Sequence, residues 1–261
     1  MLLRFQEHAL AFSSDIRGMF HQVRLLQSDK PLLRFLWRDL MPENPPSVYE
    51  WQVLPFGITC SPCCATFALQ KHVQDHSQPG EDVQVIIEKS FYVDNCLHSL
   101  TSREAARVLV DKLHHLLAEG GFELRHYGRP DVQEPALGLH WHYQSDTLSY
   151  KHRVVDCSVA TMRNIYKVLA SQYDPLGYII PYTTRAKVLV QRLWNKKRDW
   201  DDPQLPDDLL HSWRLWEAEL EHLPKVTLPR CYSSENMDHP YSVRDIHVFS
   251  DASEQAYGAV A

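Results

Sequence analysis

Two short segments each place a carboxylate where a strand is expected to end or turn. Asp15 lies between Ser14 and Ile16, and Asp94 is followed by Asn95. Carboxylates that converge repel each other unless a cation lies between them. A pair of divalent ions held there can lower the pKa of an attacking hydroxyl and neutralise charge on the leaving oxygen of an in-line phosphoryl transfer, the two-metal mechanism. Each segment alone also has a plainer interpretation, because Asp15 suits a helix N-cap and Asp94-Asn95 suits a turn.

The elements around these carboxylates decide whether they can meet. The apolar stretch from residue 9, broken at Asp15, favours a strand that leads into a short helix or turn, and Asp94-Asn95 is typical of a tight hairpin turn. Strands are also expected at 48–53, 83–88, 122–124 and 137–143, and amphipathic helices at 63–76 and 102–118. The order strand, helix, hairpin, helix, strand predicts an α+β fold with a ferredoxin-like sheet. In that sheet the first strand and the hairpin are neighbours, so the two carboxylates would converge.

The second half of the chain has a different character. Helices are expected at 161–171, 185–197 and 206–221, followed by a polar linker and a strand at 246–250. We therefore divide the 261 residues into an α+β part at 1–155, a mainly helical part at 156–240 and a short strand region at 241–261.

Composition restricts the class of protein. The formal charge of −6 argues mildly against a nucleic-acid binder, because phosphate backbones are held mainly by Lys and Arg. The N-terminal residues lack the apolar core of a signal peptide, and no apolar run is long enough to cross a membrane. We expect an intracellular protein, cytoplasmic or nuclear. Cys60 and Cys63 have the spacing of a zinc half-site, but no second pair follows, and we expect them on a buried helix.

Seven segments, taken in order, resemble the reverse transcriptases of Pao/BEL-type retrotransposon polyproteins. The first five resemble successive motifs of the reverse transcriptase palm, and the last two resemble the stretch from thumb to ribonuclease H. The segments are DIRGMFHQV (15–23), LPFGIT (54–59), FYVDN (91–95), GFELR (121–125), LGLHW (137–141), YDPLG (173–177) and VFSDAS (248–253). Together they extend over nearly the whole chain.

The resemblance implies an RNA-directed DNA polymerase that uses Mg²⁺, or Mn²⁺, and acts on an RNA or DNA template-primer and deoxynucleoside triphosphates. Asp15 and Asp94 would be the metal-ligating carboxylates, with Asn95 at the position of a further one. Phe20 would lie under the sugar of the incoming nucleotide, and Phe56 and Gly57 would line its pocket, with Gly57 allowing close backbone approach.

Two further sets of residues are implied outside the nucleotide site. Leu137, Gly138 and Trp141 would grip the primer, and Asp251 would be the first metal carboxylate of a ribonuclease H domain. The helical part would be the thumb and connection. Because Asp251 lies so close to the last residue, we do not expect ribonuclease H activity from this chain alone.

Two departures from the family pattern leave a second hypothesis open. Asn95 stands where the family has a carboxylate, so that three carboxylates become two, and we expect impaired polymerisation. The chain is also expected to lack the basic fingers that hold the triphosphate. A non-catalytic module derived from a retroelement, which binds nucleic acid or a protein partner, is the alternative.

Overall fold

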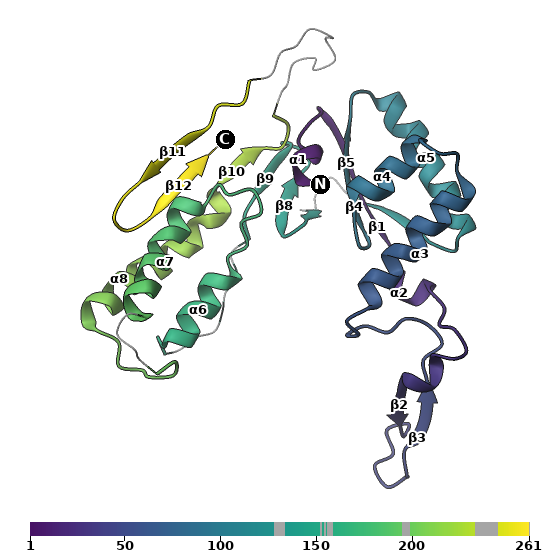
Figure 1. Ribbon diagram of the computed structural model, residues 1–261, viewed down its shortest axis with the longest axis horizontal. Helices are drawn as coiled ribbons and strands as arrows, with labels where there is room; N and C mark the ends of the chain where they lie inside the picture. The colour runs from purple at the N-terminus through teal and green to yellow at the C-terminus, as the bar shows by residue number, and fades with distance from the viewer. Residues whose placement is uncertain are drawn as a thin grey trace. The chain divides into compact units, whose positions relative to one another are not determined.

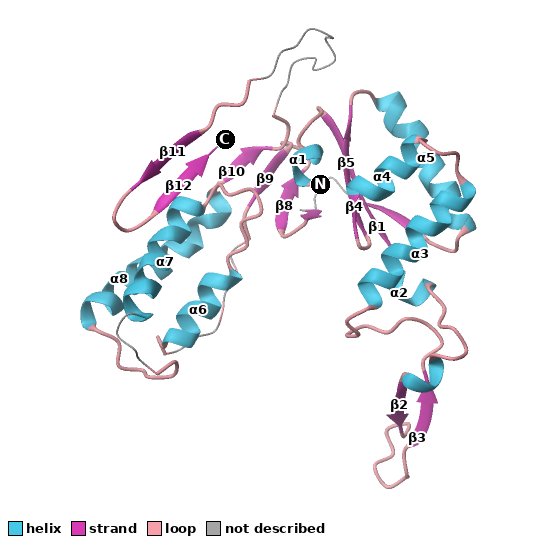
Figure 2. Ribbon diagram, viewed as in Figure 1, coloured by secondary structure: helices cyan, strands magenta, loops and turns pink. Residues whose placement is uncertain are grey.

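The computed structural model describes residues 1–127, 134–151, 153, 155, 159–194, 199–232 and 245–260. Figure 1 shows the chain as two compact units. Unit 1 comprises Met1–Val132 and Cys231–Glu235, and unit 2 comprises Gln133–Arg230 and Asn236–Ala261. The strands and helices of both units are distinguished in Figure 2.

Unit 1 is built on a four-stranded antiparallel sheet with the order β4-β5-β1-β6. The strands are β1 (Leu10–Ile16), β4 (Phe91–Tyr92), β5 (Asn95–Leu100) and β6 (Leu124–Tyr127). β1 therefore has a partner on each side, and β5 is inserted between β4 and β1. The expected adjacency of the first strand and the hairpin is confirmed by this pairing.

Three helices supply most of the core of unit 1: α3 (Ser61–His76), α4 (Asp82–Ser90) and α5 (Arg103–Glu119). Figure 1 shows them beside the sheet, where Leu69, Leu113 and Leu117 are completely or almost completely buried. α5 begins as its sequence predicts, because the Ser102 side chain accepts a hydrogen bond from the Ala105 amide at 3.1 Å. The predicted helices at 63–76 and 102–118 are confirmed.

Two predictions for unit 1 were wrong in detail. Residues 83–88 form helix α4 and not a strand. Their β-branched composition favours a strand, but the buried positions Val83, Ile86, Ile87 and Ser90 have helical spacing, and burial against α3 and α5 outweighs the weaker local propensity. The hairpin turn is shifted by one residue: its tip is Val93-Asp94, and Asn95 already belongs to β5.

The remaining elements of unit 1 are short. They are α1 (Leu2–Phe5), α2 (Met19–Gln22), the 3₁₀ helix η1 (Lys30–Leu32), β2 (Arg34–Trp37) and β3 (Ser47–Glu50). β2 and β3 form a largely exposed two-stranded ribbon, and β3 covers only the first half of the strand predicted at 48–53.

Unit 2 contains a four-stranded antiparallel sheet with the order β10-β9-β8-β7. Its strands are β7 (Glu134–Ala136), β8 (Leu139–His142), β9 (Thr147–Ser149) and β10 (Thr227–Pro229). The helices are α6 (Met162–Ser171), α7 (Ile180–Trp194), α8 (Asp207–Glu219) and the 3₁₀ helix η2 (Leu220–Lys225). A separate hairpin, β11 (Phe249–Ala252) and β12 (Tyr257–Val260), replaces the single strand predicted at 246–250.

The helices of unit 2 pack through aromatic residues. Tyr182 on α7 stacks on Trp216 on α8 with ring centroids 4.9 Å apart. The Tyr182 hydroxyl donates to the Trp216 carbonyl at 2.7 Å, and the Trp216 indole donates back to the Tyr182 carbonyl at 2.9 Å. α7 begins five residues before the predicted start at Arg185, and Tyr182 in this added turn takes part in the packing.

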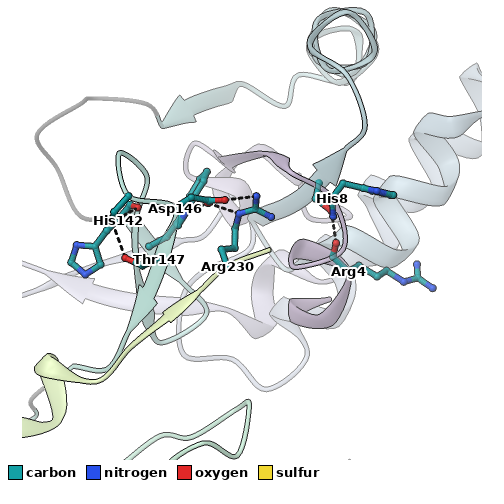
Figure 3. A network of polar contacts seen from close by, with 9 residues as sticks. Arg4, His8, His142, Asp146, Thr147 and Arg230 are labelled. Atoms are coloured by element: carbon teal, nitrogen blue, oxygen red, sulfur yellow. Dashed lines mark hydrogen bonds and ion pairs between the residues drawn. The ribbon is translucent and has the colours of Figure 1, made fainter. Parts of the chain in front are cut away.

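A buried ion pair joins the β8–β9 turn to the residue that follows β10. Figure 3 shows the Arg230 guanidinium directed at the Asp146 carboxylate, with nitrogen–oxygen distances of 2.6 and 2.7 Å. The Arg230 side chain is 0% exposed, and Asp146 also accepts a hydrogen bond from the Trp141 indole at 2.9 Å. Bidentate contacts of this kind are the strong form of a charged hydrogen bond. They fix the β10 end of the sheet on the turn.

Two observations bear on the surface. No helix in the described ranges is long and apolar enough to cross a membrane. Cys60, Cys63 and Cys64 are exposed at the start of α3, so the expectation that they lie on a buried face was wrong. The buried face of α3 is formed instead by Ser61, Ala65, Leu69 and Val73.

The burial of Arg230 gives a stability prediction. Arg230→Ala leaves a partly buried Asp146 carboxylate without its cation and should cost about 3 kcal/mol of unfolding free energy. Urea unfolding followed by the fluorescence of the buried tryptophans of unit 2 measures this. The matched control is Arg163→Ala, which removes an equally close pair with Asp201 whose side chains are 51% and 63% exposed. The control should cost about 0–1 kcal/mol, and equal losses in both variants would contradict the assignment.

Candidate functional site

Asp15 lies at the end of the central strand of unit 1. It is paired with Asn95 on β5 and with Arg125 on β6. Its side chain is half-buried, and its Oδ1 atom is buried without a hydrogen-bond donor among the described residues. A buried carboxylate oxygen with no donor is costly, and such atoms in native structures are commonly explained by a bound ion or water. The next residue, Ile16, is fully buried and anchors the strand.

The β4–β5 turn brings Asp94 to the same end of β1. The Ile16 amide donates a hydrogen bond to the Asp94 carbonyl at 2.9 Å, which ties the turn to the residue after Asp15. Val93, at the tip, has φ = 56°, a left-handed conformation that is uncommon for a β-branched residue. Its side chain packs against the hydrophobic core of unit 1, and this contact holds the strained conformation.

The two carboxylates interact electrostatically. Burial raises the pKa of the Asp94 carboxyl above its usual value, and the negative charge of Asp15 raises it further. Hydrogen bonds from the Asp94 backbone and from Asn95 oppose this shift. The Asn95 amide nitrogen donates to Asp94 Oδ1 at 2.8 Å. Asn95 therefore stabilises the charge of Asp94 in the absence of a cation.

The donors at this end of the sheet fit a divalent cation held by two carboxylates. The unpartnered oxygen of Asp15 and the repulsion between Asp15 and Asp94 are the observations that support the fit. Only these two carboxylates are available as ligands in the part of the chain that the structure describes. No group of three or more His, Cys, Asp or Glu that could hold a metal ion occurs among the described residues.

The predicted nucleotide-site residues Phe20 and Phe56 are in contact. Their rings meet edge to face with centroids 5.1 Å apart, and the Phe56 side chain is 65% exposed. Gly57 has φ = 86°, and a Cβ placed on it would meet no atom within 4 Å. The glycine is therefore required by the backbone conformation, and the space beside it is open. The Ser61 hydroxyl donates to the Pro55 carbonyl at 2.8 Å and fixes this loop on α3.

His21 is a member of this aromatic group that the sequence reasoning did not single out. Its ring packs against Phe56 at 5.0 Å and stacks on Trp51 at 6.1 Å. Its place directly after Phe20 in the first motif was the only indication in the sequence. Phe20, His21, Trp51 and Phe56 are thus linked by ring contacts into one aromatic group of unit 1.

The residues predicted to grip a primer belong to unit 2. Leu137 and Gly138 form the β7–β8 turn with φ = 48° and 91°. A Cβ on Gly138 would come within 2.5 Å of the Tyr173 ring, so this glycine is required by both its conformation and its packing. Trp141 is 7% exposed, and its indole is bound to Asp146.

Asp251, the predicted ribonuclease H carboxylate, is exposed on β11, opposite Gly258 on β12. Its Oδ1 accepts a hydrogen bond from the Ala252 amide at 2.8 Å.

Comparison with known families assigns both halves of the chain. Residues 3–127 match the reverse transcriptase (RNA-dependent DNA polymerase) family, and residues 161–261 match the Pao retrotransposon-like RNaseH-like domain. No curated protein matches the chain. Asp15 and Asp94 lie in the first matched stretch, and Asp251 lies in the second. The two matches, in this order along one chain, support a fragment of a Pao-type reverse transcriptase.

Proposed function

We propose that residues 1–155 form the ferredoxin-like palm of an RNA-directed DNA polymerase, in which Asp15 and Asp94 hold a divalent metal ion for nucleotidyl transfer. Descent from such a polymerase follows from the family of residues 3–127. The observation that carries the metal-binding role is the buried Oδ1 of Asp15, which has no donor among the described residues and lies on the strand next to the Asp94 hairpin. Mg²⁺ or Mn²⁺ in this position would supply the charge neutralisation that phosphoryl transfer requires.

The chain's own residues would position the substrate. The exposed Phe56 ring and the Phe20 ring, held edge to face, offer an apolar surface for the sugar and base of a deoxynucleoside triphosphate. Phe20 is the residue that would exclude a 2′-hydroxyl by steric contact. The open space beside Gly57 lets the substrate approach the backbone there.

Because Asn95 replaces a carboxylate, the polymerase activity of this site is expected to be lower than that of a site with three carboxylates. Its amide oxygen can still contact a metal ion but brings no charge, and its amide nitrogen is bound to Asp94. A second metal ion would therefore have a weak ligand set, and we expect impaired catalysis.

The same observation supports the second candidate function, a non-catalytic module that binds nucleic acid or a protein partner. The hydrogen bond from Asn95 partly offsets the repulsion between the Asp94 and Asp15 carboxylates, so these two side chains can lie close together without a metal ion. In this case unit 1 retains the polymerase fold without its chemistry.

The other assignments complete the proposal. Residues 156–240 would be the thumb and connection, and 241–261 the start of the ribonuclease H-like domain, with the β11–β12 hairpin and with Asp251 as its carboxylate. Leu137, Gly138 and Trp141 would form the primer grip. The burial of Trp141 makes the Leu137-Gly138 turn the more accessible part of that segment.

Primer extension on an oligonucleotide-primed RNA template tests the polymerase proposal. We expect weak extension by the native chain with Mn²⁺, a loss of about a hundredfold or more in Asp94→Ala, and a gain in Asn95→Asp. Asp111→Ala, which removes an exposed carboxylate on α5, is the control and should behave as the native chain.

The outcomes separate the two functions. Primer extension by Asn95→Asp alone would show that the native chain is a binding module, inactivated by the residue at position 95. Absence of primer extension in the native chain and in all variants, with melting curves like that of the native chain, would contradict the polymerase proposal for this chain.

Metal binding can be tested without turnover. Asn95→Asp replaces the 2.8 Å contact between amide and carboxylate with two neighbouring carboxylates, so the metal-free variant should be less stable than the native chain by about 1 kcal/mol. Mn²⁺ should restore it, by about 2.7 kcal/mol at a metal concentration 100 times its dissociation constant. Thermal unfolding with and without Mn²⁺ measures both effects. A variant that is as stable as the native chain in EDTA and unresponsive to Mn²⁺ would refute the site.

The role of Phe20 predicts a change in sugar selectivity. In the most active background, Phe20→Ala should raise incorporation of ribonucleotides relative to deoxynucleotides by about tenfold to a hundredfold, because a steric exclusion is removed. Single-nucleotide extension with each triphosphate measures the ratio. Phe67→Ala on α3, an aromatic residue 65% exposed, is the control and should leave the ratio unchanged.

A further inference from the structure

One face of the unit 2 sheet carries a row of polar and basic residues. Side chains alternate between the two faces of a strand, and in β8 and β9 the buried residues Trp141 and Leu148 are paired on one face. His140 is paired with Ser149 and belongs to the opposite face, as does His142. Lys151 and Arg153 continue this alternation beyond β9.

These residues line a cavity of about 320 Å³. Its walls are His140, His142, Ser149, Tyr150, Lys151 and Arg153, and Pro224 of η2 closes one side. A cavity of this size is at the lower end of the range for small-molecule sites. None of the predicted metal, nucleotide or primer-grip residues contributes to it.

The cavity has an excess of positive charge. Among the described residues no Asp or Glu lines it, and neither Lys151 nor Arg153 makes an ion pair with a carboxylate there. The other described arginines of unit 2 are paired with carboxylates, namely Arg163, Arg185, Arg192, Arg214 and Arg230. In a chain with a net charge of −6, a cavity wall with two cations and no carboxylate among the described residues favours an anion.

A carboxylate that contacts the cavity wall is held by hydrogen bonds of its own. Asp174 accepts hydrogen bonds from the Tyr150 hydroxyl at 2.6 Å and from the Gly177 and Ile179 amides at 2.9 and 3.0 Å. It therefore stabilises the loop after α6, and no ion pair in the described part of the chain joins it to Lys151 or Arg153.

Several of the lining groups are held in place. The His142 Nε2 atom lies 2.7 Å from the hydroxyl of the buried Ser149, which orients the imidazole. The Arg153 guanidinium lies over the Tyr173 ring, 5.9 Å from its centroid. Burial lowers the pKa of His140, and the positive charges of Lys151 and His142 lower it further. The electrostatic environment of the cavity thus disfavours the protonation of His140 and favours the binding of an anion.

We propose that this cavity binds a phosphate group through Lys151, Arg153, His140 and the His142–Ser149 pair. Arg and Lys together with hydroxyl and imidazole donors match an anion that accepts hydrogen bonds from several directions. The phosphate can be carried by a nucleic-acid strand or be free in solution, and the chemistry of recognition is the same. The proposal is independent of metal binding and catalysis at Asp15 and Asp94.

Calorimetric titration of the full chain with inorganic phosphate, and separately with a short single-stranded RNA, tests the site. The native chain should bind at least one probe saturably. The double variant Lys151→Gln/Arg153→Gln should bind it about a hundredfold more weakly, about tenfold for each charged hydrogen bond removed. Lys187→Gln removes an exposed cation from α7 of the same unit and should leave the affinity unchanged.

The two probes distinguish the sources of the phosphate. Saturation by inorganic phosphate that is lost in the double variant supports a site for a free anion, and saturation by RNA alone, lost in the same variant, supports a backbone phosphate. Absence of saturable binding of both probes to the native chain overturns the proposal, as does equal affinity in the native chain and a double variant with the same melting temperature. If the double variant does not fold, Lys151→Gln alone decides, with an expected loss of about tenfold.

Discussion

Strand β1 has a hydrogen-bonded partner on each side, and this double pairing fixes the position of Asp15. The register sets Asp15 opposite Asn95 on β5 and Arg125 on β6. A slip of one residue on either side would exchange the faces of the strand and expose the buried Ile16. The core under α3, α4 and α5 therefore specifies where the carboxylate lies. The strained backbone of Val93 is a second consequence, since the tip must reach the end of β1 while its side chain stays in the core.

Unit 2 depends on a different kind of interaction. The Arg230–Asp146 pair joins residues 84 positions apart and replaces water around a fully buried guanidinium. Buried pairs of this kind add little net stability compared with an apolar substitute, but the loss of one partner is costly. The pair therefore acts mainly on specificity, because it forms where β10 is paired with β9.

Much of the fold followed from local patterns, and the errors have identifiable physical causes. α5 could be predicted because Ser102 caps it and its apolar residues have helical spacing. α4 could not, because a run rich in Val and Ile favours strands until its burial on two other helices is known. The shift of the hairpin turn was not predictable either, since an Asp-Asn pair tolerates a left-handed conformation better than Val93 does. The order of elements was enough to predict that β1 and the hairpin are neighbours. The Arg230–Asp146 pair and the aromatic contacts of His21 depend on tertiary contacts that no local pattern contains.

The way in which Asn95 is held has a consequence for the history of the gene. Its position is fixed by backbone pairing with Tyr92 and with Asp15, which does not depend on the side chain. Its amide nitrogen donates a hydrogen bond to Asp94, where a third carboxylate would repel Asp94 in the absence of a metal ion. Codons for Asn and Asp differ by a single base. A lineage can therefore lose and regain the third carboxylate in one mutational step, with selection acting on the chemistry while the fold stays unchanged.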